Sequence, residues 1–373
     1  MILGKKRKIL WLTWKDKKNP ASGGAEVVNQ EIAKKLAEDG HQVVFIVAGF
    51  PKSKKEEIID GYKIIRVGNR WSVYLQAYKY YKKHFQGWAD LVIEEINTIP
   101  FFAKFYTKEK NILFIHQLCR EIWFYQIFFP LSFIGYILEP IYLWLLSDRK
   151  AITVSESTKK DLMRFGFKAK NIRIISEGIE IEPVKDLDVI TKFKKPTILA
   201  LGAIKAMKRT DHIIRSFEIA KQKMPQLKLK IAGVGFGRYY HKIIKLIKKS
   251  PYQKDIEYLG KVSLDDKIKL MQKCHLILVT SVKEGWGLIV TEANSQGTPA
   301  VVYDVDGLRD SVKDNKTGLI VRKNTPKYLA RRIVELAEDE KKYARLQKAA
   351  WKWSKSINFD NCYKKFLEVI NEK

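Results

Sequence analysis

The sequence is poor in cysteine, and we find in it no secretory-signal pattern, no internal repeat and no low-complexity tract. Its three cysteines, Cys119, Cys274 and Cys362, stand far apart, and none belongs to a C-x-x-C pair. This scarcity argues against a disulfide framework or a zinc site and fits a reducing compartment. Residues 1–14 have neither the long apolar run nor the small-residue cleavage site of a secretory signal. We therefore expect a folded cytoplasmic protein.

Acidic residues are also scarce relative to basic ones. The chain has 41 Asp and Glu against 70 Lys and Arg, a formal net charge of +29. Such a charge attracts nucleic acid, anionic lipid or a phosphorylated substrate. Lysines spread over the whole chain are equally what a compositional bias of the genome produces. The charge by itself therefore does not identify a partner.

Apolar runs and helical patterns, by contrast, alternate from end to end. The 373 residues, 46% of them hydrophobic, suffice for two folded domains. Val28, Ile32 and Leu36 follow helical spacing, and Gly40 stands where that helix should end. Similar helical stretches separate short apolar runs. We predict strands at 8–13, 43–47, 63–67, 91–95, 111–115, 151–154, 172–175, 197–201, 227–233, 256–260, 276–280, 300–304 and 318–321.

Strand–helix alternation predicts parallel sheets, and two successive series predict two doubly wound, Rossmann-like α/β domains. The charged stretch 180–196 ends in a proline directly before a new strand. We therefore place the first domain at 1–180 and the second at 181–358. A helical pattern at 359–373 is left open as a segment that packs back on the first domain. Ligands of such sheets bind beyond the carboxyl ends of the strands, so we expect the site in a cleft between the two domains.

Two carboxylates, Glu284 and Glu292, stand eight residues apart, just after a predicted strand. A helix is predicted to begin between them, near Gly287. The free N–H groups of Gly287, Leu288 and Ile289 would then form an anion site suited to a phosphate. Two acids about 10 Å apart cannot share one proton transfer, but they can hold hydroxyls at opposite ends of a long ligand. A sugar nucleotide has that layout.

Several motifs extend this pattern over nearly the whole chain. They are SGGAE (22–26), FIHQ (114–117), TVSESTKKDL (153–162), EGI (177–179), LGAIKAMKRTD (201–211), EGWGLIVTEANSQGTP (284–299) and DVDGLRDSVKDNKTGLIV (304–321). Together they resemble the retaining glycosyltransferases of family 4, which have the GT-B fold of two domains facing across a cleft. The motifs are specific for the family and not for one sugar. The resemblance implies that residues 1–180 bind the acceptor and 181–358 bind a nucleoside diphosphate sugar.

The resemblance also implies roles for residues of the donor site. Glu284 matches the glutamate that meets hydroxyls of the donor sugar, and Glu292 matches the one that meets the ribose. Lys208 matches the lysine on the donor diphosphate, where a cation would stabilise the charge of the leaving group. Ala203 replaces an arginine that the family usually has. Whether Lys205 compensates for it or is a solvated surface residue stays open.

Other candidates lie in the first domain. Gly23 and Gly24 form a plain turn or, as the resemblance implies, the wall of the sugar pocket. The family often has a histidine near the reacting sugar at the place of His116, so we expect it to donate a hydrogen bond there. Ser155 matches a serine of the family and could equally cap a helix. Glu177 stands where the family usually has asparagine, and no role is predicted for it.

Two segments suggest a lipid surface. Residues 122–146 are long and apolar enough to span a bilayer, but Glu139 and two prolines interrupt them. A span there would separate the two halves of the site, so the segment is either buried helix or a surface that dips into lipid. Residues 73–85 mix aromatic and basic side chains, as suits an anionic membrane interface or an ordinary surface helix.

We thus expect a retaining hexosyltransferase whose catalytic residues are Glu284, His116 and Lys208. It should need no cofactor and no metal, because the helix start and Lys208 replace a cation, and we expect no Asp-x-Asp metal motif at a strand end. The resemblance implies front-face attack, with the leaving phosphate accepting the proton of the acceptor. A lipid-linked or saccharide acceptor of the cell envelope is expected, at the inner face of the membrane, and nucleic acid is not an expected partner.

Three alternatives remain. A phosphorylase would need a pyridoxal lysine site, which is not found, whereas a soluble synthase keeps the same fold. A basic nucleic-acid-binding protein would show strongly salt-dependent binding but would leave Glu284 and Glu292 unexplained. A degenerate family member that binds without turnover is consistent with Ala203.

Overall fold

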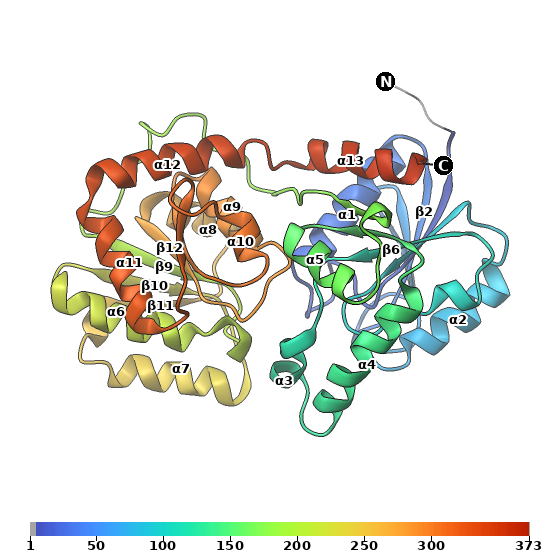
Figure 1. Cartoon of the computed structure of the whole chain (residues 1–373), viewed down its shortest axis with the longest axis horizontal. Helices are drawn as coiled ribbons and strands as arrows, with labels where there is room; N and C mark the ends of the chain where they lie inside the picture. Colours follow the sequence, from blue (N-terminus) through green and yellow to red (C-terminus); the bar gives the residue numbers. More distant parts are fainter. Residues whose placement is uncertain (1–4, 373) are drawn as a thin grey trace. The chain divides into compact units, whose positions relative to one another are not determined.

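The computed structural model describes residues 5–372, which divide into two compact units (Figure 1). Unit 1 runs up to Gly178 and resumes at Phe359, and unit 2 is Ile179–Asn358. The chain therefore leaves unit 1, builds unit 2 and returns to unit 1 with its last helix.

An eight-stranded sheet forms the centre of unit 1. Its strands are β1 Lys8–Leu12, β2 Gln42–Val47, β3 Glu56–Ile59, β4 Tyr62–Arg66, β5 Leu91–Glu95, β6 Lys110–Ile115, β7 Lys150–Thr153 and β8 Ile172–Ile174. They follow the order β3-β4-β2-β1-β5-β6-β7-β8, and all neighbours except β3 and β4 are parallel. The central strand β1 is buried from its second residue on, as expected for a strand covered on both faces. The chain winds outward from β1 in both directions, so the sheet is doubly wound as predicted.

Strand β3 was not predicted, and it is the antiparallel edge of this sheet. It is joined to β4 by Asp60 and Gly61, which have φ of 48° and 85°. Two residues with positive φ form the tight hairpin turn that Asp-Gly sequences favour. The Asp-Gly pair was therefore the sequence signal for β3.

The helices of unit 1 surround this sheet. They are α1 Gly24–Glu38, α2 Val73–His84, α3 Trp123–Gln126, α4 Leu131–Leu146, α5 Glu156–Arg164 and α13 Phe359–Asn371. Helix α13 packs beside α1, with Phe366 stacked on Trp11 of β1 at 5.9 Å between ring centroids. A guanidinium nitrogen of Arg7 donates to the carbonyl of Ile370 at 2.7 Å. These contacts make α13 part of the core of unit 1.

Unit 2 contains a six-stranded sheet that is parallel throughout. Its strands are β9 Thr197–Leu201, β10 Lys228–Ala232, β11 Ile256–Gly260, β12 Leu276–Val279, β13 Ala300–Tyr303 and β14 Gly318–Val321. Their order is β11-β10-β9-β12-β13-β14. Strand β9 therefore lies between β10 and β12, and the loops that follow β9 and β12 leave the same sheet edge in different directions. That is the place where doubly wound sheets bind ligands.

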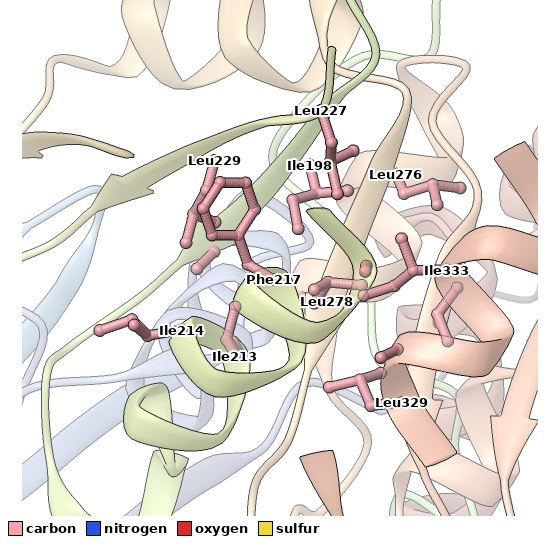
Figure 2. Packing of buried hydrophobic residues seen from close by; sticks show 14 of the residues in the cluster. Ile198, Ile213, Ile214, Phe217, Leu227, Leu229, Leu276, Leu278, Leu329 and Ile333 are labelled. Carbon is pink, nitrogen blue, oxygen red and sulfur yellow. The ribbon is translucent and has the colours of Figure 1, made fainter. Parts of the chain in front are cut away.

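The helices of unit 2 bury the apolar side chains of both sheet faces. They are α6 Thr210–Lys223, α7 Gly237–Lys249, α8 Leu264–Lys273, α9 Leu288–Ser295, α10 Leu308–Ser311, α11 Pro326–Glu338 and α12 Glu340–Ser354. Figure 2 shows part of one core, where Phe217 of α6 and Ile333 of α11 lie with Ile198, Leu229 and Leu278 of the strands. All five side chains are at most 2% exposed. The sheet edge that carries the loops after β9 and β12 is thus built on a rigid base.

Candidate active site

Two loops of unit 2 are tied together at the carboxyl edge of its sheet. The hydroxyl of Thr280, directly after β12, donates to the carbonyls of Lys208 and Arg209 at 2.8 and 3.0 Å. The amide of Val282 donates to the carbonyl of Met207 at 2.8 Å. Because all three bonds end on backbone carbonyls of the loop after β9, this loop and the loop after β12 hold a fixed position relative to each other.

The side chains of Lys208 and Glu284 meet across these two loops. The ammonium group of Lys208 forms an ion pair with the carboxylate of Glu284, which also accepts from the hydroxyl of Ser281. Both charged side chains remain partly exposed, at 34% for Lys208 and 15% for Glu284. The predicted diphosphate-binding lysine and the predicted sugar-binding glutamate are therefore neighbours that a ligand can reach.

Helix α9 begins where the sequence predicted it. Its N-cap, Gly287, has φ of 93°, a conformation that glycine adopts without strain. A Cβ at this position would meet a terminal carbon of Leu308 at 2.8 Å, so a larger residue would force the Leu308 side chain to shift. Leu288 and Ile289, in the first turn, are half-buried. The first N–H groups of a helix have no acceptor within the helix, which leaves them for an anion.

Glu292 lies on the next turn of α9. Its carboxylate forms an ion pair with Lys267 of α8 at 2.7 Å, and the glutamate side chain is 12% exposed. Both predicted glutamates thus have a lysine partner from a neighbouring element. Lys205 is exposed on the loop after β9, as is Ala203.

An Asp-x-Asp motif does follow a strand, contrary to expectation. Asp304 and Asp306 come directly after β13, and both bind the guanidinium group of Arg309. Asp306 also pairs with the buried Lys283 at 2.8 Å. These cations already neutralise the two carboxylates. Over residues 5–372 we find no group of three or more His, Cys, Asp and Glu side chains placed to hold a metal ion.

In unit 1, Gly23 and Gly24 stand exposed at the start of α1. The amide of Gly23 donates to the carboxylate of Glu26 at 2.6 Å, and Lys15 pairs with the same carboxylate at 3.0 Å. These bonds fix the loop between β1 and α1 beneath the two glycines.

His116, at the end of β6, is buried, and both of its ring nitrogens have partners. Nδ1 lies 3.0 Å from a carboxylate oxygen of Glu177, and Nε2 lies 3.1 Å from Oδ1 of Asn29 on α1. Because the amide nitrogen of Asn29 donates to Glu95 at 2.6 Å, its oxygen is left to accept from Nε2. When the ring is protonated, Nδ1 donates to the Glu177 carboxylate as well, and His116 is then an imidazolium paired with Glu177.

The electrostatics of this cluster agree with its hydrogen bonds. Burial lowers the pKa of His116, but the hydrogen bond to Glu177 and the charges of Glu177, Glu95 and Glu26 outweigh burial and raise it above its ordinary value. Burial raises the pKa of Glu95 to about 7. The cluster therefore keeps protons that an unfolded chain would release near neutral pH.

Glu177 and Asn29 are thus the residues that sequence reasoning missed. Glu177 was given no role, yet it fixes the ring and the charge of His116. The sequence did contain a sign of this role, because Glu177 replaces the asparagine that the family usually has there. With both nitrogens bonded to the protein, His116 can reach a sugar only if Asn29 or Glu177 releases it. Ser155 caps α5, accepting from the amide of Thr158 at 3.2 Å.

The free energy of unfolding should depend on pH through the raised pKa values of the buried acids of this unit. Burial raises the pKa of Glu94, next to Glu95, to about 7, although the amides of Phe102 and Ala103 donate to it. The folded state then binds more protons than the unfolded chain between about pH 4.5 and 7, so stability falls as the pH rises, by up to about 1.4 kcal/mol for each pH unit. The loss of stability between pH 5 and pH 8 should be smaller for Glu94→Gln than for wild type, as measured by urea unfolding. An equal loss in both proteins would contradict this account.

The two segments that suggested a lipid surface differ in the structure. At α2, Tyr81 and the following Phe85 are buried, whereas Tyr78 and Leu75 are 38% and 56% exposed beside the lysines, so the surface at residues 73–85 is basic and only partly aromatic. Residues 122–146 form α3 and α4, much of whose apolar surface is exposed. Among the residues that the structure describes, no helix is long and apolar enough to cross a bilayer.

Comparison with known families assigns both units. Residues 22–183 match the family described as "Glycosyltransferase Family 4", and residues 186–353 match "Glycosyl transferases group 1". Each match covers most of one unit, and the second contains the Lys208–Glu284 pair. The chain belongs to the group 1, family 4 glycosyltransferases. The resemblance seen in the motifs is therefore confirmed.

Sequence matches to known glycosyltransferases cover part of this chain in some relatives and most of it in others. An uncharacterized glycosyltransferase of Methanocaldococcus jannaschii is 31% identical over 139 residues, which are 37% of this chain and 39% of the relative. A poly(glycerol-phosphate) α-glucosyltransferase of Bacillus subtilis is 28% identical over 48% of this chain, and the match spans 26% of the relative's length. The N-acetyl-α-D-glucosaminyl L-malate synthase of Bacillus anthracis is 24% identical over 86% of both chains.

Solved structures match this glycosyltransferase over almost its full length. Sucrose-phosphate synthase from Thermosynechococcus elongatus has a TM-score of 0.77 at 17% identity, over 98% of both chains. A glycosyltransferase involved in lipopolysaccharide biosynthesis has a TM-score of 0.76 at 16% identity, over 98% of this chain and 100% of the other. An Anabaena protein solved with UDP-glucose has a TM-score of 0.73 at 16% identity, over 98% and 99%. The predicted GT-B fold is confirmed by these neighbours.

Proposed function

We propose that this glycosyltransferase moves a hexose from a nucleoside diphosphate sugar to a lipid-linked or saccharide acceptor, in the synthesis of cell-envelope glycan or glycolipid. The observation that carries the proposal is the Lys208–Glu284 ion pair beside the start of α9. It puts a cation, a carboxylate and unbonded helix amides at one sheet edge. A diphosphate fits the cation and the amides, and sugar hydroxyls fit the carboxylate.

In the proposed reaction the bond from the anomeric carbon to the diphosphate breaks, and the acceptor oxygen attacks the same face of the sugar. The proton of the acceptor passes to an oxygen of the leaving diphosphate, so configuration is retained without a carboxylate nucleophile. Lys208 and the start of α9 stabilise the negative charge of the leaving group, which makes a metal ion and a cofactor unnecessary. Glu284 holds the sugar, and Glu292 holds the ribose.

Relatives support the choice of substrates. The Anabaena neighbour was solved with UDP-glucose, and another neighbour is described as acting in lipopolysaccharide biosynthesis. The B. subtilis relative is named as a glucosyltransferase of poly(glycerol-phosphate). These proteins favour a UDP-sugar donor and an acceptor of the cell envelope for this enzyme.

The test is release of nucleoside diphosphate from a panel of nucleotide sugars, with EDTA present throughout. Slow release from one donor by the wild type, absent in Glu284→Ala, would support a metal-independent transferase. Release that requires added Mg²⁺ or Mn²⁺ would refute metal independence. If calorimetry detected no binding of any donor, the assignment of the donor site would be wrong.

One observation favours a second candidate, a family member that binds donor without turnover. Ala203 offers no cation where the family usually has arginine. This candidate predicts donor binding with no diphosphate release, even with acceptor lipid or saccharide extract present. Gain of release in Ala203→Arg would support it.

A further inference from the structure

Helix α4 exposes most of its apolar side chains, whereas its polar residues Ser132 and Glu139 are buried beside Leu143 and Leu146. Its outward side chains are at least 46% exposed, and we call them the α4 surface: Phe133, Ile134, Ile137, Leu138, Ile141 and Trp144. No charged side chain lies among them. An amphipathic helix of a water-soluble domain has the opposite arrangement, with polar residues outside. Contiguous apolar patches of this kind mark interaction sites.

Polar contacts fix this orientation of α4. Glu139, the one charged residue of the helix, is buried and accepts from the amides of Cys119 and Arg120 at 2.7 and 2.6 Å. It also accepts from the indole nitrogen of Trp123 on α3 at 3.0 Å. A Cβ on Gly135 would lie 2.5 Å from the Trp123 ring, so the indole covers the helix backbone. Rotating α4 to bury its apolar side would break all these contacts.

The loop between α3 and α4 continues the exposed apolar surface. Phe128 and Phe129 are 73% and 77% exposed, and Phe124 of α3 is 50% exposed. Figure 1 shows α3 and α4 reaching beyond the sheet of unit 1, with this loop at their far end. The most exposed aromatic side chains of α3, α4 and the loop between them, Phe128 and Phe129, therefore stand at the tip.

Two cations, Lys104 and Arg164, lie near the last turns of α4. Lys104 donates to the carbonyl of Leu145 at 2.7 Å, at the last turn of α4, where it also pairs with Asp148. Gly166 lies beside Trp144, and two residues before it Arg164 is 75% exposed and pairs with the buried Asp161 at 3.2 Å. On α2 of the same unit the lysines stay exposed. Basic side chains flanking an apolar helix face suit anionic lipid headgroups.

The length of α4 fits a position along a membrane surface. Its 16 residues measure about 24 Å, less than the hydrocarbon core of about 30 Å. The buried side is bonded to unit 1 through Glu139 and cannot face lipid. An interfacial helix, by contrast, needs one apolar face only.

We propose that unit 1 binds anionic lipid bilayers by laying the α4 surface and the Phe128–Phe129 tip into the interfacial region. The occupant is the lipid surface and not a second copy of the chain, because an apolar face with cations at one end, on a chain of net charge +29, complements acidic headgroups over acyl chains. The inference adds a membrane partner to the proposed function, but it rests on the exposed surface alone and can be tested without donor or acceptor.

The test is flotation of the full chain with vesicles of phosphatidylglycerol and phosphatidylcholine in equal amounts. The wild type should float with these vesicles. The partition coefficient of Ile137→Glu/Ile141→Glu should fall by at least about tenfold, since two new negative charges oppose an anionic surface. The matched control is Val189→Glu/Leu264→Glu, which replaces two exposed apolar side chains of unit 2, and it should float like the wild type.

Each other result overturns the inference. Equal flotation of the wild type and the α4 variant, or no flotation of the wild type, would show that the surface does not bind lipid. A wild-type dimer in sedimentation that becomes monomeric in the α4 variant, without an effect on flotation, would make the surface a contact between copies. Nucleoside diphosphate binding by the α4 variant, measured by calorimetry, should equal that of wild type. This binding measurement distinguishes a wrong membrane inference from a wrong proposed function, because it does not depend on the α4 surface.

Discussion

Replacing Lys208 by methionine is expected to lower the rate of sugar transfer by roughly 10²–10³, because the leaving diphosphate loses a cation in a preorganised site. The side chain of methionine keeps most of the packing of the lysine stem and removes the charge. Affinity for the nucleoside diphosphate product should fall as well, since the same cation binds its phosphates. Steady-state kinetics and calorimetry with the nucleoside diphosphate would measure both effects.

Glu284→Ala should lower the rate of transfer while it raises product affinity. In the structure the Glu284 carboxylate forms an ion pair with the ammonium group of Lys208. A diphosphate must therefore compete with it. Removing a partly exposed ion pair of about 1 kcal/mol would tighten diphosphate binding about fivefold. Weaker diphosphate binding by Glu284→Ala would show that the carboxylate and the phosphates do not share Lys208.

The matched control for both variants is Lys205→Met. Lys205 is an exposed lysine on the same loop, three residues before Lys208. The variant should keep transfer within about twofold of wild type, as is usual for an exposed charge. A loss as large as that of Lys208→Met would mean that Lys205 replaces the missing arginine at Ala203.

Replacing Glu177 by alanine should destabilise unit 1 by about 3–5 kcal/mol, because it leaves the buried imidazolium of His116 without its counter-ion. The expected result is faster hydrogen exchange in β6 and α1, measured by mass spectrometry. Glu121→Ala, at an exposed carboxylate of the same unit, is the control and should leave exchange unchanged. Unchanged exchange in Glu177→Ala would contradict the ion pair.

Glu177→Gln separates charge from packing. Glutamine fills the same space and can still accept from His116, but it no longer raises the pKa of the imidazole. In wild type this raised pKa stabilises the fold fully below the unfolded value of about 6.5 and is lost as the pH rises through the folded value. The imidazole of His116, followed by NMR, should titrate at lower pH in Glu177→Gln. Titration at the wild-type pH would show that Glu177 does not hold the proton.

The sequence predicted thirteen of the strands because parallel strands covered on both faces are continuous apolar runs. β3 was missed because edge strands alternate and its residues, Glu56–Ile59, carry two glutamates. Tyr81 of α2 and Phe85, which directly follows α2, are four residues apart, a spacing that is typical of a core-facing stripe. The interpretation of residues 73–85 as a surface relied on their mixture of aromatic and basic residues and not on this helical spacing.

The candidate site was predictable as single residues and not as contacts. Lys208 and Glu284 are 76 residues apart, and they meet because β9 and β12 are neighbours in the sheet. Strand order is not encoded in local pattern. For the same reason, sequence reasoning could not pair His116 with Glu177, 61 residues later. A carboxylate in place of the family's asparagine was visible, but its partner was not.

The return of α13 to unit 1 sets an order of assembly on the ribosome. The contacts of Trp11 with Phe366 and of Arg7 with the carbonyl of Ile370 cannot form until all of unit 2 has been synthesised. Unit 2, which is continuous in sequence, can fold first, although its residues emerge later than most of unit 1. The nascent first unit therefore exposes part of its core for the time that about 180 residues take to be translated, which is when it most needs a chaperone.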